Sequence, residues 1–214
     1  MTEYKLRISK GNSKLGSIPS VSLPAIVTCP DGVPCAENDC YVKAMYRYRK
    51  NILVSHQANL DLLNHSRESF FSQLADYLNR RNPEYFRIHV SGDFVDPDYY
   101  SRWYNTAANY PDIKFLAFTK AYDILEREHY TYTPKNLTLI ASAWPGYTDP
   151  PKGYRVAWMQ DGNEHRVPSD AIECPGLCES CGMCWNLNSI GREDRKSTRL
   201  NSSHPTISRM PSSA

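Results

Sequence analysis

Long apolar runs are missing from this chain of 214 residues. No stretch approaches the ~18–20 apolar residues that a membrane-spanning helix needs, and the residues after Met1 lack the apolar region of a signal peptide. We therefore expect no membrane partner and a cytoplasmic location. Thiols stay reduced there, so clustered cysteines indicate metal or redox chemistry more often than disulfides.

Glycine-rich phosphate loops and paired histidines are also absent. No Walker-type or dinucleotide-type glycine motif occurs, so the sequence gives no sign of those nucleotide-binding classes. The histidines show no HxxxH or HxH spacing, which argues against a histidine-based metal site. A core or hydrogen-bonded role is favoured for most of them, and His89 is the one histidine in a candidate functional strand.

The chain also lacks a strong net charge of one sign once its C-terminal tail is excluded. Residues 194–204 read like one frame of a common short-read sequencing adapter, and 208–214 like its continuation. We therefore interpret 193–214 as a disordered sequencing artefact outside the native protein, which could itself continue past Arg192. Residues 194–214 carry four basic residues and one acidic residue, and without them 21 basic and 22 acidic residues remain, a net charge of −1. Net charge then gives no support for nucleic-acid binding.

Helix and strand signals alternate along the chain. Ser66 and the pair Asp96-Pro97 are typical helix starts, and an apolar stripe follows Ser66. We expect helices at 40–51 (extending to about Leu60), 66–81, 97–109 and 121–129, and strands at 21–28, 85–91, 113–118, 136–142 and 154–159. This alternation predicts an α/β fold, either a partial (β/α) barrel or an open parallel sheet. We expect an irregular N-terminal arm at 1–22 and one domain at 23–185, which includes a Cys-rich C-terminal segment at 174–185.

The strand at 85–91 has an unusual polar face. Period-two alternation would place Arg87, His89, Ser91 and Asp93 on one side, although helices normally cover both faces of a central parallel strand. Such a face requires a polar lumen or a ligand. The alternative is an edge strand with a solvated face and a simple Gly-Asp turn at Gly92.

Polar or aromatic groups also close the next two strands. Thr119 and Lys120 end one of them, and Ser142 to Trp144 end the other. Because α/β folds place their sites at the carboxyl ends of strands, we expect these groups to outline one mouth. We predict that this mouth binds a cofactor or substrate through Ser91, Gly92, Asp93, Thr119 and Lys120.

All seven cysteines lie in two groups separated by more than a hundred residues without cysteine. Four lie in the dense run Cys174-x3-Cys178-x2-Cys181-x2-Cys184, which can hold a tetrahedral zinc ion or most of an iron–sulfur cluster.

The other three, Cys29, Cys35 and Cys40, follow the first expected strand with looser spacing. Three thiolates leave one coordination position for another ligand. They could instead be small buried apolar residues, or the two groups could form one shared or two adjoining metal sites.

Several of these motifs resemble the phage "gene product 88" family. The resemblance covers nearly all of residues 8–185 and rests on 8–16, 23–30, 40–41, 88–94, 118–120 and 181–185. It implies a phage or bacterial origin but no activity, and for a phage-encoded protein the expected location is the host cytoplasm. A weaker resemblance is to radical S-adenosylmethionine enzymes, which have a three-cysteine loop after the first strand and a Gly-Gly-Glu-like motif after the second. Here the loop is Cx5Cx4C instead of their usual CxxxCxxC.

The sequence therefore predicts a metal-binding, iron–sulfur protein of a phage or bacterium. In its enzyme form it would resemble radical S-adenosylmethionine enzymes and bind S-adenosylmethionine. The alternative is a non-catalytic module, stabilised by zinc, that binds a host protein or nucleic acid. Tyrosines interleaved with Arg47, Arg49 and Lys50 could stack bases in such a module, although ordinary helix packing explains them more simply.

Overall fold

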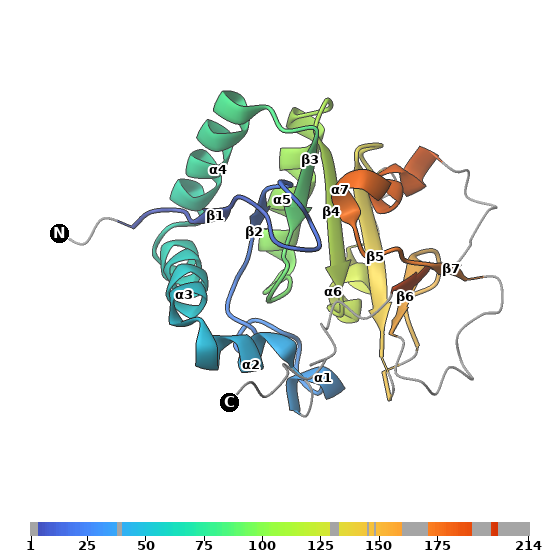
Figure 1. Ribbon diagram of the computed structural model, residues 1–214. Coiled ribbons are helices and arrows are strands. Elements are labelled where there is room, and N and C mark those ends of the chain that lie inside the picture. Colours follow the sequence, from blue (N-terminus) through green and yellow to red (C-terminus); the bar gives the residue numbers. More distant parts are fainter. Residues whose placement is uncertain are drawn as a thin grey trace, which may run out of the picture.

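A mostly parallel β-sheet runs through the protein (Figure 1). The computed structural model describes residues 4–37, 40–128, 133–144, 146–147, 149–159, 171–189 and 198–200. The strands lie in the order β1-β2-β3-β4-β5-β6-β8-β7, and every neighbouring pair is parallel except β1 and β2. They are β1 (Ile8–Ser9), β2 (Ser20–Val21), β3 (Tyr85–Ile88), β4 (Lys114–Thr119), β5 (Leu137–Ala143), β6 (Arg155–Met159), β7 (Ile172–Glu173) and β8 (Thr198–Leu200).

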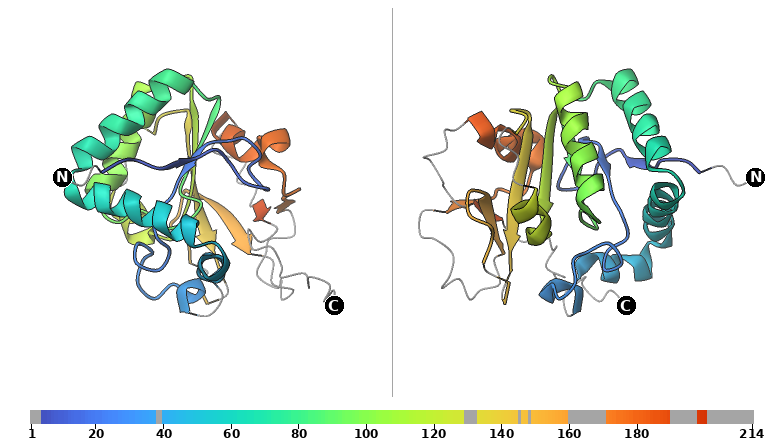
Figure 2. Two further views of the ribbon diagram at one scale, coloured as in Figure 1. Left: turned by 60° about the vertical axis from the view of Figure 1, so that its left-hand side comes forward. Right: turned by 180° about the vertical axis from the view of Figure 1, so that it is seen from behind.

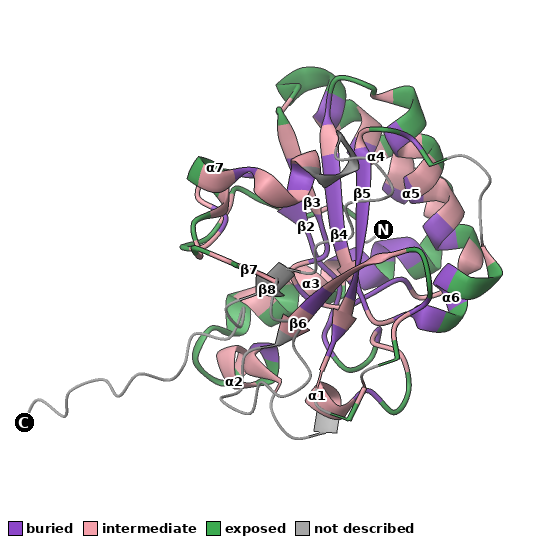
Figure 3. Ribbon diagram, turned by 90° about the vertical axis from the view of Figure 1, so that its right-hand side faces the viewer, coloured by how far each residue is buried: buried purple, intermediate pink, exposed green. Residues whose placement is uncertain are grey.

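Helices cover the two faces of this sheet unequally. Figure 3 shows α5 and α6 on one side of the strands and α7 on the other. Sequential strand order with the crossover helices on one side is the winding of a (β/α) barrel, here left open. The prediction of an α/β fold with an open sheet is thus confirmed. The helices are α1 (Pro34–Glu37), α2 (Tyr41–Tyr48), α3 (Lys50–His65), α4 (Arg67–Arg81), α5 (Pro97–Asn109), α6 (Tyr122–Arg127), α7 (Cys178–Cys181) and the 3-10 helix η1 (Met183–Ser189).

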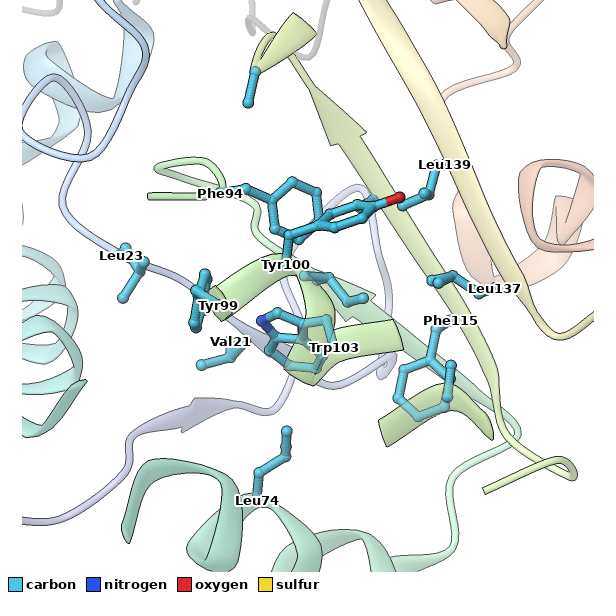
Figure 4. Close-up of a cluster of buried hydrophobic side chains, with 14 of the residues drawn as sticks. Val21, Leu23, Leu74, Phe94, Tyr99, Tyr100, Trp103, Phe115, Leu137 and Leu139 are labelled. Carbon is cyan, nitrogen blue, oxygen red and sulfur yellow. The ribbon is translucent and has the colours of Figure 1, made fainter. Parts of the chain in front are cut away.

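Each face of the sheet has its own apolar core. The outer core joins the strands to α3, α4, α5 and α6, and Figure 4 shows its aromatic centre around Tyr99 and Trp103. The inner core is smaller and lies on the α7 side. It packs Leu15 and Ile18 of the N-terminal arm and Trp185 of η1 against Leu116 and Ile140 of the sheet. Two segments far apart in sequence therefore close the inner face together.

Local signals account for the two best-predicted helices. The Ser66 hydroxyl accepts a hydrogen bond from the Ser69 N–H (3.0 Å) at the start of α4, and Asp96 accepts one from the Tyr99 N–H (2.9 Å) at the start of α5. Each satisfies a backbone donor that has no partner within the helix. Both predicted caps are confirmed.

Two strand predictions are wrong in extent. The strand expected at 21–28 is only Ser20–Val21, because Pro24 cannot donate to the ladder and Ile26 adopts a left-handed φ of 72°. The strand expected at 85–91 ends at Ile88, because His89 has a φ of 56°. This left-handed torsion breaks the period-two alternation of the side chains. Arg87 stays on the inner face above Phe118, whereas His89 turns to the outer core beside Tyr99.

The two ends of the chain also differ from expectation. The arm at 1–22 contributes β1 and β2 to the sheet, so it is not irregular throughout. Within the tail at 193–214, residues Thr198–Leu200 form β8 between β6 and β7, which corrects the expectation of disorder for those three residues. The rest of that tail lies outside the described residues. Among the described helices, none has the length and apolar character to cross a membrane.

Candidate functional site

Asp93 is the centre of a hydrogen-bonded network at the carboxyl edge of the sheet. Its Oδ1 accepts from the Thr119 hydroxyl (2.5 Å) and the Phe94 N–H (2.8 Å), and its Oδ2 accepts from the Lys120 N–H (2.7 Å). The residue is only 5% exposed. Burial raises the pKa of Asp93, while these three hydrogen bonds act in the opposite direction. The network joins the segment after β3 to the end of β4.

Lys120 extends this network to β5. Its Nζ donates to the Ser142 hydroxyl (3.1 Å) and lies 5.2 Å from the centre of the Trp144 ring. The Tyr147 hydroxyl donates to the Lys120 carbonyl (3.0 Å). The structure therefore brings together the polar groups of three successive strand ends, as the sequence predicts, although Asp93 and Thr119 are buried rather than open to solvent.

Gly92 and Ser91 hold the first cysteine loop against this edge. A Cβ on Gly92 would lie 2.4 Å from the Thr28 hydroxyl and 2.8 Å from the Leu23 Cβ, and Gly92 also has a left-handed φ of 75°. The Ser91 carbonyl accepts from the Leu23 N–H (3.0 Å). Both residues therefore pack closely against the loop, and only glycine fits at position 92.

Cys29, Cys35 and Cys40 lie in the loop and short helix that cover the carboxyl edge. The Cys29 sulfur accepts from the Ile26 N–H (3.3 Å), and burial raises the pKa of its thiol to about 11. Cys29 is close enough to Cys35, Cys40 and Asp93 for electrostatic interaction, which raises its pKa further. Burial also raises the pKa of the Cys35 thiol, and nearby Lys120 lowers it.

The C-terminal cysteines lie on the inner face instead. Cys178 and Cys184 pack against the inner core, where burial raises the pKa of both thiols, that of Cys184 to about 12. Arg87 is near both of them and partly offsets this rise. Burial lowers the pKa of Arg87 itself to about 10.

The two cysteine groups are not brought to one centre. α1 lies at the foot of the sheet and α7 beside its upper half, and the blue α1 and the orange α7 stay apart in both views of Figure 2. All seven thiols are free and partly exposed. Within the described residues, no three His, Cys, Asp or Glu side chains are grouped closely enough to hold a metal ion. Metal binding at either group would require cysteine side chains to move.

His89, the histidine singled out by the sequence, is a core residue. Its Nε2 is hydrogen-bonded to the Tyr99 hydroxyl (2.9 Å), and it is 2% exposed. Burial lowers its pKa to about 3, and Arg87 adds to that effect. It lies on the opposite face from the thiols near Arg87.

Two tyrosines of α2, which sequence reasoning assigned to helix packing, attach α2 to the edge. The Tyr46 hydroxyl bonds to His56 Nδ1 (2.8 Å) and accepts from the Ala25 N–H (3.2 Å), and the Tyr41 hydroxyl donates to the Val90 carbonyl (2.8 Å). His56 was not identified from the sequence because no spacing pattern links it to Tyr46. Burial lowers the pKa of His56 to about 4.

Comparison with known proteins identifies relatives for nearly the whole described chain. The family model "Gene product 88" matches residues 3–187. The "Gene 88 protein" of Mycobacterium phage D29 is 26% identical over 221 residues, and that of Mycobacterium phage L5 is 26% identical over 218 residues. Each match covers 87% of this chain and 90% of the relative. No solved structure gives a significant match. The chain belongs to the gene product 88 family.

Proposed function

We propose that this protein binds an iron–sulfur cluster through Cys29, Cys35 and Cys40, and that it is an enzyme using S-adenosylmethionine or a similar small molecule. One observation carries the proposal: Cys35 interacts electrostatically with both Asp93 and Lys120. A cluster on this loop would thus lie beside a carboxylate and an ammonium group at the carboxyl edge of a parallel sheet, where α/β folds bind their ligands.

The donor set fits a cluster with an open position. Three thiolates from one loop leave one iron without a protein ligand, and the bound cluster would supply one-electron reduction of a ligand there. The sulfur atoms are not grouped at bonding distance. Each cysteine has a single χ angle with three staggered positions, so side-chain rotation can bring them closer.

The neighbouring groups suit an amino-acid zwitterion. Asp93 Oδ2 accepts one hydrogen bond from a described residue, which leaves it a lone pair for a ligand ammonium group. Lys120 Nζ donates to Ser142 and keeps further N–H donors for a carboxylate. S-adenosylmethionine carries both groups.

Anaerobic purification of the full chain tests the cluster. We expect a brown protein with bound iron and sulfide, which a Cys29→Ser/Cys35→Ser/Cys40→Ser variant loses. A colourless parent protein without iron would overturn the proposal.

Calorimetry with S-adenosylmethionine tests the ligand. We expect Lys120→Met to weaken binding at least tenfold, because it removes the ammonium group. It leaves the backbone N–H that donates a hydrogen bond to Asp93. Tyr147→Phe is a matched control, since the hydrogen bond that its hydroxyl makes among the described residues goes to the Lys120 carbonyl and not to the ammonium group. Unchanged affinity in Lys120→Met, or no binding by the parent, would contradict this part.

The alternative is a non-catalytic module, stabilised by zinc, with a host protein or nucleic acid as partner. It draws support from the solvent side of α2, where Tyr48 is 87% exposed between the exposed residues Arg47 and Arg49. An aromatic ring flanked by cations is suited to stacking on bases. Under this alternative, single-stranded DNA should bind with strong salt dependence, and Arg47→Gln/Arg49→Gln should weaken that binding.

A further inference from the structure

Arg87 is a partly exposed cation near the C-terminal cysteines. On the inner face of the sheet, its Nε–H donates to the His89 carbonyl (3.0 Å) and its guanidinium lies 4.1 Å above the Phe118 ring. None of the ion pairs among described residues includes Arg87. Asp93 acts on it electrostatically without forming an ion pair. Because a partly desolvated cation is stabilised by nearby negative charge, an anion on the inner face would stabilise Arg87 further.

Two thiols lie near the Arg87 guanidinium. Cys178 and Cys184 both interact electrostatically with Arg87, and both pack against the inner core on the same side of the sheet. A neutral thiol supplies no counter-charge, whereas a metal-bound thiolate does. Metal binding by these cysteines would thus place negative charge beside Arg87.

The backbone around these cysteines forms a tight turn. Cys178 and Cys181 occupy the first and last positions of the single-turn helix α7, so they are on one face of it. Gly182 ends the turn with a left-handed φ of 58°, and its N–H donates to the Cys178 carbonyl (2.8 Å). Cys184 follows three residues after Cys181, at the start of η1.

Two contacts anchor this turn to the rest of the protein. The Cys178 N–H donates to the Lys14 carbonyl of the N-terminal arm (2.8 Å), and the Trp185 indole N–H donates to the Phe86 carbonyl of β3 (3.2 Å). Trp185 is 3% exposed. The cysteines are therefore carried by a segment that is held in place before any metal binds.

We propose that Cys174, Cys178, Cys181 and Cys184 bind one Zn²⁺ as a closed four-thiolate centre, separate from the Cys29–Cys40 site, and that Arg87 balances part of its charge. Binding releases four thiol protons and leaves the centre with a net charge of −2. Closed four-thiolate zinc sites stabilise structure and have no open catalytic position. The sulfur atoms would reach the metal by rotation about χ1, because the side chains are not grouped at ligating distance among the described residues.

Cobalt binding to the full chain tests this centre independently of the proposed function. After anaerobic purification and chelation, added Co²⁺ should give the thiolate charge-transfer and intense visible bands of a tetrahedral four-sulfur site. Cys178→Ser/Cys184→Ser should lose these bands, whereas Cys29→Ser/Cys35→Ser/Cys40→Ser should keep them. No tetrahedral spectrum in the parent, or the reverse pattern in the variants, would overturn the proposal. Iron and sulfide retained by the C-terminal group in place of zinc would overturn the choice of metal.

Alkylation mapping gives a second test that needs no variant. Zn²⁺ should protect the four C-terminal cysteines of the parent chain from iodoacetamide, as read by mass spectrometry, and leave Cys29, Cys35 and Cys40 reactive. Equal reactivity of both groups with and without Zn²⁺ would contradict the proposal.

Substitution of Arg87 tests its positioning role. Arg87→Gln should lower Zn²⁺ affinity about 10–100-fold, the usual effect of losing a group that supports metal ligands. Arg87→Lys should restore part of that loss because it keeps the positive charge. Equal affinity in the parent and Arg87→Gln would remove Arg87 from the proposal.

Discussion

The two cysteine groups differ in the charges that surround them. Cys29, Cys35 and Cys40 cover the carboxyl edge of the sheet, where Asp93 and Lys120 provide both signs of charge. Cys178 and Cys184 lie on the inner face beside Arg87, which takes part in none of the ion pairs among the described residues, and Lys14 also acts on Cys178. A site with both signs of charge suits a zwitterionic ligand, whereas cations beside thiols suit a fixed anion. The same residue type can therefore serve a ligand-binding edge in one region and a structural centre in the other.

Removal of the Asp93 carboxylate should have the largest effect and should be confined to the first region. Asp93→Ala leaves the Thr119 hydroxyl and the Phe94 and Lys120 N–H groups without their acceptor, so we expect a loss of about 4 kcal/mol in the free energy of unfolding. Urea unfolding measures it. Asp93→Asn keeps one acceptor oxygen and should lose less. If Asp93→Ala alters Co²⁺ binding by the C-terminal group under native conditions, the two regions are not independent.

Substitution of two glycines in the first region distinguishes the cost of lost close packing from the cost of backbone strain. Gly92→Ala should cost about 3 kcal/mol, because its Cβ would overlap Thr28 and Leu23 and its φ is positive. Gly32 has a similar φ of 70°, but a Cβ there meets nothing within 4 Å, so Gly32→Ala should cost only about 1 kcal/mol. Chemical denaturation of both variants provides the comparison. Equal losses would mean that the loop does not depend on its contact with Gly92.

Local chemistry explains which parts of the fold the sequence predicts. The caps at Ser66 and Asp96 are local, and α4 and α5 match their predicted ranges to within a residue. The end of β3 depends on the left-handed φ of His89, for which no turn residue or glycine gives a signal. That single torsion reverses the expected face of His89 and leaves Arg87 alone on the inner side.

The site shows the same division between local and long-range information. The sequence correctly groups Asp93, Thr119 and Lys120, because carboxyl ends of neighbouring parallel strands must meet at one edge. It does not predict that Leu15 of the arm and Trp185 close the inner face together, since they are far apart in the chain. It also leaves open whether the two cysteine groups meet, which depends on the path of the chain around the sheet.

Low pH should destabilise both regions together through His89, a buried residue directly after β3. Its pKa is about 3 in the folded protein against an ordinary value of 6.5, so the unfolded state takes up the proton first. Stability should therefore be level above pH 6.5 and fall below it, by a loss on the order of 2 kcal/mol at about pH 5, and continue to fall toward pH 3. His56, with a pKa of about 4, adds to the fall.

A variant isolates the His89 contribution. His89→Asn does not titrate, tolerates a left-handed φ and keeps an amide for Tyr99, so it should flatten part of the slope of unfolding free energy against pH. An unchanged slope would show that His89 is not the cause. If acidification makes the thiols of only one cysteine group accessible to alkylation, the two regions unfold separately.

Replacement of Trp185 should have the smallest effect and should be confined to the second region. Trp185→Phe keeps an aromatic ring beside Tyr85 but removes the hydrogen bond from the indole N–H to the Phe86 carbonyl (3.2 Å), at a cost of about 1 kcal/mol. The matched control is Trp158→Phe, since the buried Trp158 indole N–H has no partner among the described residues and no such bond is lost. Because Trp185 follows Cys184 directly, Trp185→Phe should also weaken Co²⁺ binding by a few-fold while iron binding at the Cys29–Cys40 loop is unchanged. A loss of iron with retained cobalt would reverse the assignment of the two regions.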